Sequence, residues 1–391
     1  MEVLVEDGLI REVSDRHLKA NDAAVIDVGG RTLMPGLIDA HIHAYGSDVN
    51  VQKIDLAGDP YRTAHAARML GFALDCGFTT VRDIGGGDYS LWRAIEDRLI
   101  RAPRFLYAGK ILSMTGGHGD FRQMSESRHQ SGYCSCGEFN TLSVVADGVD
   151  DCIKAVREEL RRGAHCIKIM GSGGVVSPTD PMWMNQYRED EIRAIVNETS
   201  ERRTYTSAHC HPVSAVRRCI EFGVRVIEHG TLMDDETAKY VASKGAFVVP
   251  TMAIIFALVD LGRKLGFPPQ SQEKAQYAFT QAIRGLESLR KAGVQTGFGT
   301  DLLGETYVQQ CREFTIRREV FSTLEILRQA TSTNAELLQQ TGRLGCVAPD
   351  AHADLLVVDG DPLKDIDLLA GSGRHLRVIM RAGELIKNEL N

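Results

Sequence analysis

The chain has 391 residues, which at about 100–200 residues per domain corresponds to two or three domains, or to one large barrel. It is 43% hydrophobic and 25% charged, the balance of an ordinary globular protein, which excludes a fibrous or intrinsically disordered chain. The formal net charge is −7, and acidic and basic residues are interspersed. No basic stripe is present, so we expect no nucleic-acid partner.

The sequence contains no segment that we expect to span a membrane. The most apolar stretch, residues 247–259, has 13 residues and includes Pro250, so it is too short to cross a bilayer. The first residues lack the basic start of a secretory signal. The nine cysteines form no Cys-x-x-Cys pair, and the close pair is Cys134 and Cys136. We therefore expect a reduced, cytoplasmic protein.

Both ends of the chain have the pattern of short β-strands. Residues 3–13 predict two strands around an Asp7-Gly8 turn. Residues 353–358 and 378–386 repeat this pattern near the other end. We expect the two ends to pair in one small, discontinuous β-sandwich domain.

Between these ends, short apolar runs alternate with amphipathic, helix-like segments. The eight strand-like runs are residues 37–43, 79–84, 104–108, 166–170, 204–210, 225–228, 246–249 and 295–300. The helix-like segments include residues 149–162, 189–203, 212–222 and 234–244. Eight strand–helix units predict an α/β fold, the (β/α)8 or TIM barrel. A doubly wound open sheet is the alternative, but Gly85-Gly86-Gly87 lacks the full glycine pattern of its phosphate-binding turn.

These patterns divide the chain into three segments. Residues 1–35 and 349–391 form the two parts of the β-sandwich, and residues 36–348 form a metal-binding barrel. Two connections within the barrel, residues 109–147 and 251–272, are long enough to be binding loops or lids.

Six side chains that suit metal binding fall within or at the ends of predicted barrel strands. They are His41, His43, Lys168, His209, His229 and Asp301. The carboxyl ends of barrel strands converge at the mouth of the active site, so we expect these side chains to lie together. Each of them alone would more often be a core histidine, a paired lysine or a helix cap. Imidazole and carboxylate ligands together suit Zn²⁺ and similar divalent ions.

Lys168 has a different chemistry from the other five residues. An ammonium group cannot coordinate a cation, so Lys168 would contribute only after losing its proton or after reacting with carbon dioxide to form a carbamate. Its apolar strand favours the neutral, reactive amine. A carbamate would bridge two metal ions as a carboxylate does.

Residues 34–43 (MPGLIDAHIH) strongly resemble the first-strand signature of the metal-dependent amidohydrolase superfamily. The resemblance continues at residues 167–169, 208–209, 227–230, 299–301 and 350–361 and covers nearly the whole chain. It implies two divalent ions, which we expect to be Zn²⁺. His41, His43 and Asp301 would hold one ion, His209 and His229 the other, and carboxylated Lys168 would bridge them.

Two further stretches are most similar to the dipeptidase and carboxypeptidase branch of that superfamily. They are residues 114–120 (MTGGHGD) and 171–175 (GSGGV). The branch includes prolidase-like enzymes, carboxypeptidases acting on C-terminal Arg or Lys, and relatives that cleave ochratoxin-type N-acyl amino acids. Many of these relatives carry a tyrosine two positions after the fifth-strand ligand, where this chain has His211.

The resemblance implies a hydrolase that cleaves an amide or peptide bond beside a free carboxylate, with a hydrophobic residue or proline preferred at that end. A metal-bridging hydroxide would attack the bond, with Asp301 as general acid and base. His118 would bind the substrate carboxylate with help from His211, although a solvent-exposed loop histidine is the alternative for His118. We expect a small-molecule substrate, a homo-oligomer, and no membrane partner.

Two other functions remain open. One is a cyclic-amide hydrolase (imidazolonepropionase-like) or deaminase of the same superfamily, in which a single metal ion would leave Lys168 without a bridging role. The other is a non-catalytic scaffold, which should have lost ligands, whereas all six are present.

Overall fold

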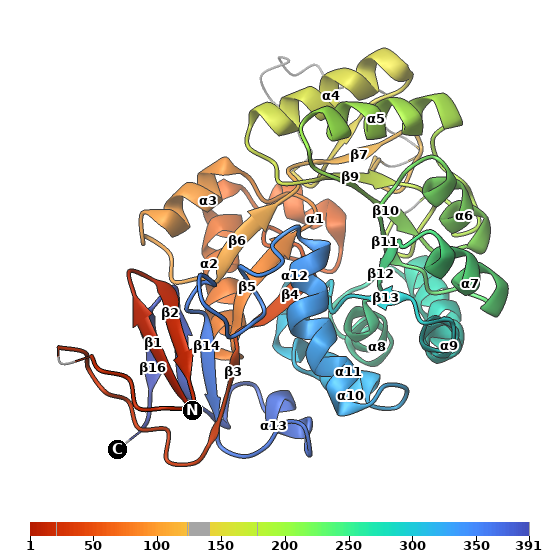
Figure 1. The fold of residues 1–391 in the computed structure, drawn as a ribbon. Coiled ribbons are helices and arrows are strands. Elements are labelled where there is room, and N and C mark those ends of the chain that lie inside the picture. Colours follow the sequence, from red (N-terminus) through yellow and green to blue (C-terminus); the bar gives the residue numbers. More distant parts are fainter. Residues whose placement is uncertain (21, 123, 125–140, 178, 391) are drawn as a thin grey trace.

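The computed structural model describes residues 1–20, 22–122, 124, 141–177 and 179–390. Figure 1 shows a ring of strands covered by helices and, beside it, a small β domain that contains the amino terminus and the last strand. Cys134 and Cys136 lie outside the described residues. The seven cysteines within them are free thiols, and the cytoplasmic location stays a prediction.

Parallel strands form the wall of the large domain, which is the predicted (β/α)8 barrel. The wall strands are β4 (Leu37–Ile42), β5 (Phe78–Asp83), β6 (Arg104–Tyr107), β7 (Ile111–Ser113), β9 (Ile167–Met170), β10 (Thr206–Cys210), β11 (Val226–His229), β12 (Phe247–Val249) and β13 (Gln295–Thr296). They pair in two parallel arcs, β4-β5-β6 and β13-β12-β11-β10-β9-β7. Backbone hydrogen bonds join the arcs, because Ala40 N donates to Phe298 O and His165 N donates to Tyr107 O.

The third barrel strand is longer than the sequence predicts. After β6 the chain turns at Gly109 and continues as β7, which pairs with β8 (Ser143–Val145). Gly109 has a φ of 75°, and a Cβ at this position would overlap the carboxylate of Glu159. Glycine therefore permits the turn, and part of the loop predicted at residues 109–147 is β-structure.

Helices cover the outside of the barrel (Figure 1). They are α1 (Val51–Leu56), α2 (Asp59–Asp75), α3 (Tyr89–Glu96), α4 (Val149–Arg161), α5 (Glu189–Glu201), α6 (Val213–Glu221), α7 (Asp235–Ser243), α8 (Met252–Leu261), α9 (Pro269–Ala292), α10 (Arg312–Arg317), α11 (Thr323–Arg328) and α12 (Asn334–Leu337). Two short helical segments, η1 (Gly304–Gln309) and η2 (Gln329–Thr333), complete this layer. Of the described helices, none combines the length and the apolar character that crossing a bilayer requires.

The prediction of a long loop at residues 251–272 is wrong, because helix α8 occupies much of this segment. The sequence of α8 (MAIIFALVDL) is apolar almost throughout, so it shows no 3.6-residue alternation of polar and apolar side chains. Six of its ten residues are buried, which explains why its pattern is not amphipathic.

The small domain packs a hairpin against a four-stranded sheet. The hairpin is β1 (Glu2–Glu6) and β2 (Leu9–Ser14), and the antiparallel sheet has the order β16 (Glu384–Asn388), β15 (Leu376–Arg381), β14 (Leu355–Val358) and β3 (Thr32–Pro35). Val5 and Ile10 of the hairpin share an apolar cluster with Leu33 and Leu355 of the sheet. The segment predicted as one strand at residues 378–386 spans two strands, and the exact domain boundaries stay a prediction. A short helix, α13 (Asp367–Ala370), follows β14.

Candidate active site

The eight predicted site residues line a single pocket at the carboxyl ends of the barrel strands. They are His41, His43, His118, Lys168, His209, His211, His229 and Asp301. Asp301 reaches this pocket although β13 is short, because the backbone N–H groups of Thr300 and Asp301 both donate to the carbonyl oxygen of His41. The convergence expected from the fold is therefore present.

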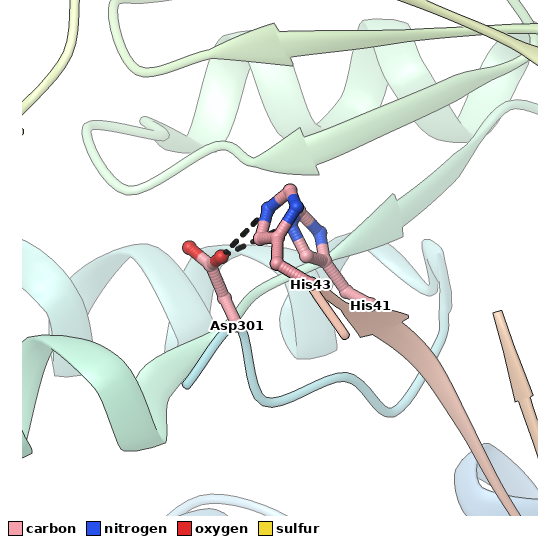
Figure 2. A group of neighbouring side chains, drawn as sticks. All are labelled: His41, His43 and Asp301. Atoms are coloured by element: carbon pink, nitrogen blue, oxygen red, sulfur yellow. Dashed lines mark ion pairs between the residues drawn. The ribbon is translucent and has the colours of Figure 1, made fainter. Parts of the chain in front are cut away.

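His41, His43 and Asp301 form the tightest group in this pocket (Figure 2). One ligand atom from each lies within 4.8 Å of the others. Oδ1 of Asp301 is 3.3 Å from Nε2 of His41 and 3.2 Å from Nε2 of His43. Burial raises the pKa of Asp301, but these two imidazoles outweigh it and hold that pKa well below its usual range. Two imidazoles and a carboxylate at this spacing suit a divalent cation.

Both imidazoles of this group are oriented by hydrogen bonds from the opposite ring nitrogen. Nδ1 of His41 donates to Glu228 Oε2 at 2.7 Å, and Nδ1 of His43 donates to the carbonyl oxygen of Gly85 at 2.9 Å. Each ring therefore presents Nε2 to the pocket, the arrangement in which metal-ligating histidines are commonly held.

Two buried aspartates hold the backbone that carries these ligands. Asp39 accepts hydrogen bonds from the N–H of His41 and from the hydroxyl of Thr300, which joins the first strand to the segment before Asp301. Asp83 accepts from the N–H groups of Ala44 and Gly85. A single carboxylate thus fixes the backbone after His43 and also Gly85, whose carbonyl oxygen orients the imidazole of His43.

His209 and His229 lie beside the first group. Their ring centroids are 4.5 Å apart, and the ring of His229 is 5.0 Å from that of His41. Nδ1 of His229 is hydrogen-bonded to the hydroxyl of Thr251 at 2.7 Å, which leaves Nε2 of His229 for another partner. Burial lowers the pKa of both His209 and His229 well below the usual range, so both are neutral, as metal ligands must be.

Lys168 lines the same pocket with only 2% of its surface exposed. Burial lowers the pKa of its ammonium group, although the carboxylates of Glu228 and Asp301 oppose this shift. Arg82 is the ion-pair partner of Glu228, with Nη2 2.6 Å from Oε1. Glu228, the buried carboxylate that could act as the counter-ion of Lys168, is therefore already paired with Arg82.

His229 and Asp301 share an unusual backbone conformation. Their φ angles are 70° and 58°, in the left-handed region that glycine favours. His229 is the last residue of β11, Asp301 follows β13, and both side chains line the pocket. Strained backbone of this kind is often found at functional sites.

His118 is buried, with 4% of its surface exposed, so the solvent-exposed alternative is wrong. Its Nδ1 lies 2.6 Å from the hydroxyl of Ser177 and 3.3 Å from Oδ2 of Asp180. Its ring centroid is 4.3 Å from that of His209. His118 thus contacts the candidate metal ligands on one side and a buried carboxylate on the other.

His211 also turns into the pocket. Nδ1 of His211 is 3.0 Å from the hydroxyl of Thr231, and its ring stacks on that of His229 with centroids 5.1 Å apart. Burial, together with the nearby His118, lowers the pKa of His211 to about 3. It is therefore a neutral donor or acceptor at physiological pH.

Apart from Thr251, the rest of the pocket wall is apolar. Val51 and Leu142 belong to one buried apolar cluster, and Phe121 and Val176 pack against it. Helix α8 contributes further wall residues, Ile254, Ile255 and Leu258. The connection predicted at residues 251–272 therefore does line the pocket, but from a helix rather than a loop.

The sequence did not single out several residues that orient this site. These are Asp39, Asp83, Ser177, Asp180, Glu228 and Thr251. Asp39 and Glu228 carry a signal, since each is an acidic residue inside a buried strand. Buried acids in strands usually have a charged or hydrogen-bonded partner.

The chain matches the model of the amidohydrolase family over residues 32–385 and belongs to this family of hydrolases, whose members generally depend on metal ions. Among its relatives, ochratoxinase of Aspergillus niger is 30% identical over 371 residues, which cover 91% of this chain and 75% of that protein. The predicted superfamily and branch are thereby confirmed.

Solved structures give the same picture. A prolidase in complex with N-methylphosphonate-L-proline is 43% identical and has a TM-score of 0.95, covering 99% of this chain and 94% of its own. A Xaa-Pro dipeptidase with methionine bound in its active site is 26% identical, with a TM-score of 0.84 and coverage of 99% and 94%.

Proposed function

We propose that the protein hydrolyses the amide bond of dipeptides or N-acyl amino acids that carry a free C-terminal carboxylate, with proline or another apolar residue at that end. The placement of His118 carries this proposal. It is a buried hydrogen-bonding side chain that packs against His209, and it lines a pocket that also has many apolar side chains. The similarity to a prolidase and to ochratoxinase supports the same class of substrate.

The donor set fits two divalent ions, such as Zn²⁺. His41, His43 and Asp301 would hold one, His209 and His229 would hold the other, and Lys168 as a carbamate would lie between them. Hydrogen bonds at Nδ1 leave Nε2 available on His41, His43 and His229. Bound divalent ions polarise a carbonyl group and lower the pKa of water to near neutrality.

Asp301 is our candidate for proton transfer. Its Oδ1 faces His41 and His43, while its Oδ2 lies 3.9 Å from Nδ1 of His229. We assign the proton to Oδ2, which accepts it from the attacking water and passes it to the leaving amine.

His118 and His211 form the proposed carboxylate subsite. Because Nδ1 of His118 is engaged by Ser177 and Asp180, Nε2 is the nitrogen that faces the substrate carboxylate. His211 lies at the same end of the pocket, since both rings pack against His209. The apolar side chains of α8 then contact the side chain next to the carboxylate.

The test compares a free-acid substrate with its C-terminal amide. A lost charge-assisted hydrogen bond is worth about 1.5–3 kcal/mol, so the amide should have a kcat/KM roughly 10- to 150-fold lower. The ratio should collapse in His118→Ala and persist in His17→Ala, a matched change at an exposed histidine. Equal rates for acid and amide in the unchanged enzyme would overturn the proposal, and faster turnover of cyclic amides would favour the alternative function.

A further inference from the structure

Lys274, near the amino-terminal end of α9, binds the loop between β9 and α5 with its ammonium group. Nζ of Lys274 donates to the carbonyl oxygens of Gly174, Ser177 and Asp180 at 3.0, 3.1 and 2.7 Å. An ammonium has three N–H donors, so this cluster of carbonyl groups uses all of them. Burial lowers the pKa of Lys274, and the carboxylate of Asp180 opposes this shift.

The three residues that Lys274 binds through their backbone are the residues that surround His118. Ser177 and Asp180 contact Nδ1 of His118 through their side chains. Gly174 packs against the imidazole so closely that a Cβ there would overlap the ring. Lys274 therefore binds the backbone of the same short stretch of loop that contacts His118.

Asp180 links the parts of this arrangement. Its Oδ2 accepts a hydrogen bond from the N–H of Gly174 at 2.9 Å and lies 3.3 Å from Nδ1 of His118. Burial raises the pKa of Asp180, but the charge of His118 and hydrogen bonds from His118, Ser177 and Gly174 outweigh it and lower the pKa to about 2. The carboxylate is thus ionised and tied to both the loop and the imidazole.

We propose that Lys274 is a positioning residue for the carboxylate subsite, because it fixes the loop that orients His118. This inference rests on the proposed function, in which His118 reads the substrate carboxylate. Lys274 is not among the pocket-lining residues, whereas its neighbour Ala275 is. Replacing Lys274 should therefore weaken the preference for a substrate with a free carboxylate and leave the chemistry at the candidate metal ligands largely intact.

The measured quantity is the ratio of kcat/KM for a free-acid substrate to kcat/KM for its amide. This ratio does not depend on the fraction of enzyme that is folded, so a variant that folds poorly still gives a result. A misplaced binding group can cost up to about 100-fold, and we expect Lys274→Met to lower the ratio by about 10-fold. The change should appear mainly as a higher KM for the acid, with the kcat and KM of the amide changed less.

Two variants serve as controls. Lys274→Arg keeps a cation with several N–H donors and should recover part of the ratio. Lys291→Met removes a lysine from the other end of the same helix, where it pairs with Asp235, and should leave the ratio unchanged. A purely structural role for Lys274 would lower the rates with acid and amide equally.

The double variant Lys274→Met/His118→Ala tests the coupling directly. Residues that act through one another are not additive, so the double variant should have the ratio of His118→Ala alone. A wild-type ratio in Lys274→Met, alongside a collapsed ratio in His118→Ala, would overturn this inference and leave the proposed function standing. No acid preference in the unchanged enzyme would overturn both.

Discussion

Oε2 of Glu228 lies 2.7 Å from Nδ1 of His41, although β11 and β4 are not neighbours in the barrel wall. Both side chains are buried, and the other carboxylate oxygen of Glu228 binds Arg82. The hydroxyl of Ser207 also bonds to that oxygen. The barrel interior thus carries a charged network beneath the pocket, and this network selects which nitrogen of His41 faces the candidate metal position.

Glu228→Gln should destabilise the protein strongly. The substitution keeps the shape of the side chain but leaves the buried Arg82 without its counter-charge, which typically costs 3–5 kcal/mol. Urea unfolding of the two proteins measures this difference. Glu198→Gln removes the partner of the exposed Arg157 and should cost no more than about 1 kcal/mol. If both variants lost the same free energy of unfolding, burial could not be the reason why the Arg82–Glu228 ion pair matters more for stability.

Lys168→Ala should lose activity and bound metal together. If Lys168 is a carbamate that bridges two ions, its removal takes away one ligand from each, and we expect a fall in activity of at least about 100-fold. A short carboxylic acid added to the variant should restore part of the rate. The checks are metal content per chain and a ¹³C signal from the carbamate after exposure to labelled carbon dioxide. Lys154→Ala, at an exposed lysine, is the control.

Asp301→Asn should lower kcat far more than it weakens substrate binding. Removing a proton-transfer group costs about 10²–10⁴-fold in rate. Since Asp301 is also a candidate ligand, metal content has to be measured in the same preparation. A fully metallated Asp301→Asn protein with the kcat of the unchanged enzyme would exclude proton transfer by this residue.

Asp180→Asn should show a stability loss that depends on pH. The pKa of Asp180 is lowered to about 2 in the folded protein from 3.8, so its ionised form stabilises the fold above pH 3.8 and this contribution disappears as the pH falls toward 2. The corresponding free energy is about 2 kcal/mol. Urea unfolding at several pH values should show a difference in unfolding free energy between the two proteins at pH 6, and this difference should close as the pH falls through about 2. A difference in unfolding free energy that stays constant with pH would contradict the stabilising role assigned to the ionised carboxylate of Asp180.

The regular parts of this fold could be predicted because they depend on local patterns. Each of the eight apolar runs overlaps a barrel strand. The candidate ligands could be predicted for a geometric reason, since parallel strands bring their carboxyl ends to the same rim. Helix α8 could not be recognised, because a helix that is apolar on most sides loses the alternation that identifies it.

The residues that orient the ligands were harder to find. Lys274 and Asp180 are separated by 94 positions in the sequence, and neither lies in a motif. Their contact depends on how a loop and a helix pack above the barrel, which no local pattern encodes. Glu228 and Asp39 are exceptions, because a buried acid inside a strand signals that a partner exists without identifying that partner.

The left-handed backbone at His229 and Asp301 means that higher folding stability and the proposed catalytic role make opposite demands on these two positions. A non-glycine residue in this conformation typically costs about 1–2 kcal/mol, and glycine relieves that cost. The glycine substitution that would relax either position thus also removes a side chain that we propose as a metal ligand. Selection for thermal stability alone would favour these glycine variants. Any effort to stabilise the protein therefore has to measure the metal content and turnover of every selected variant.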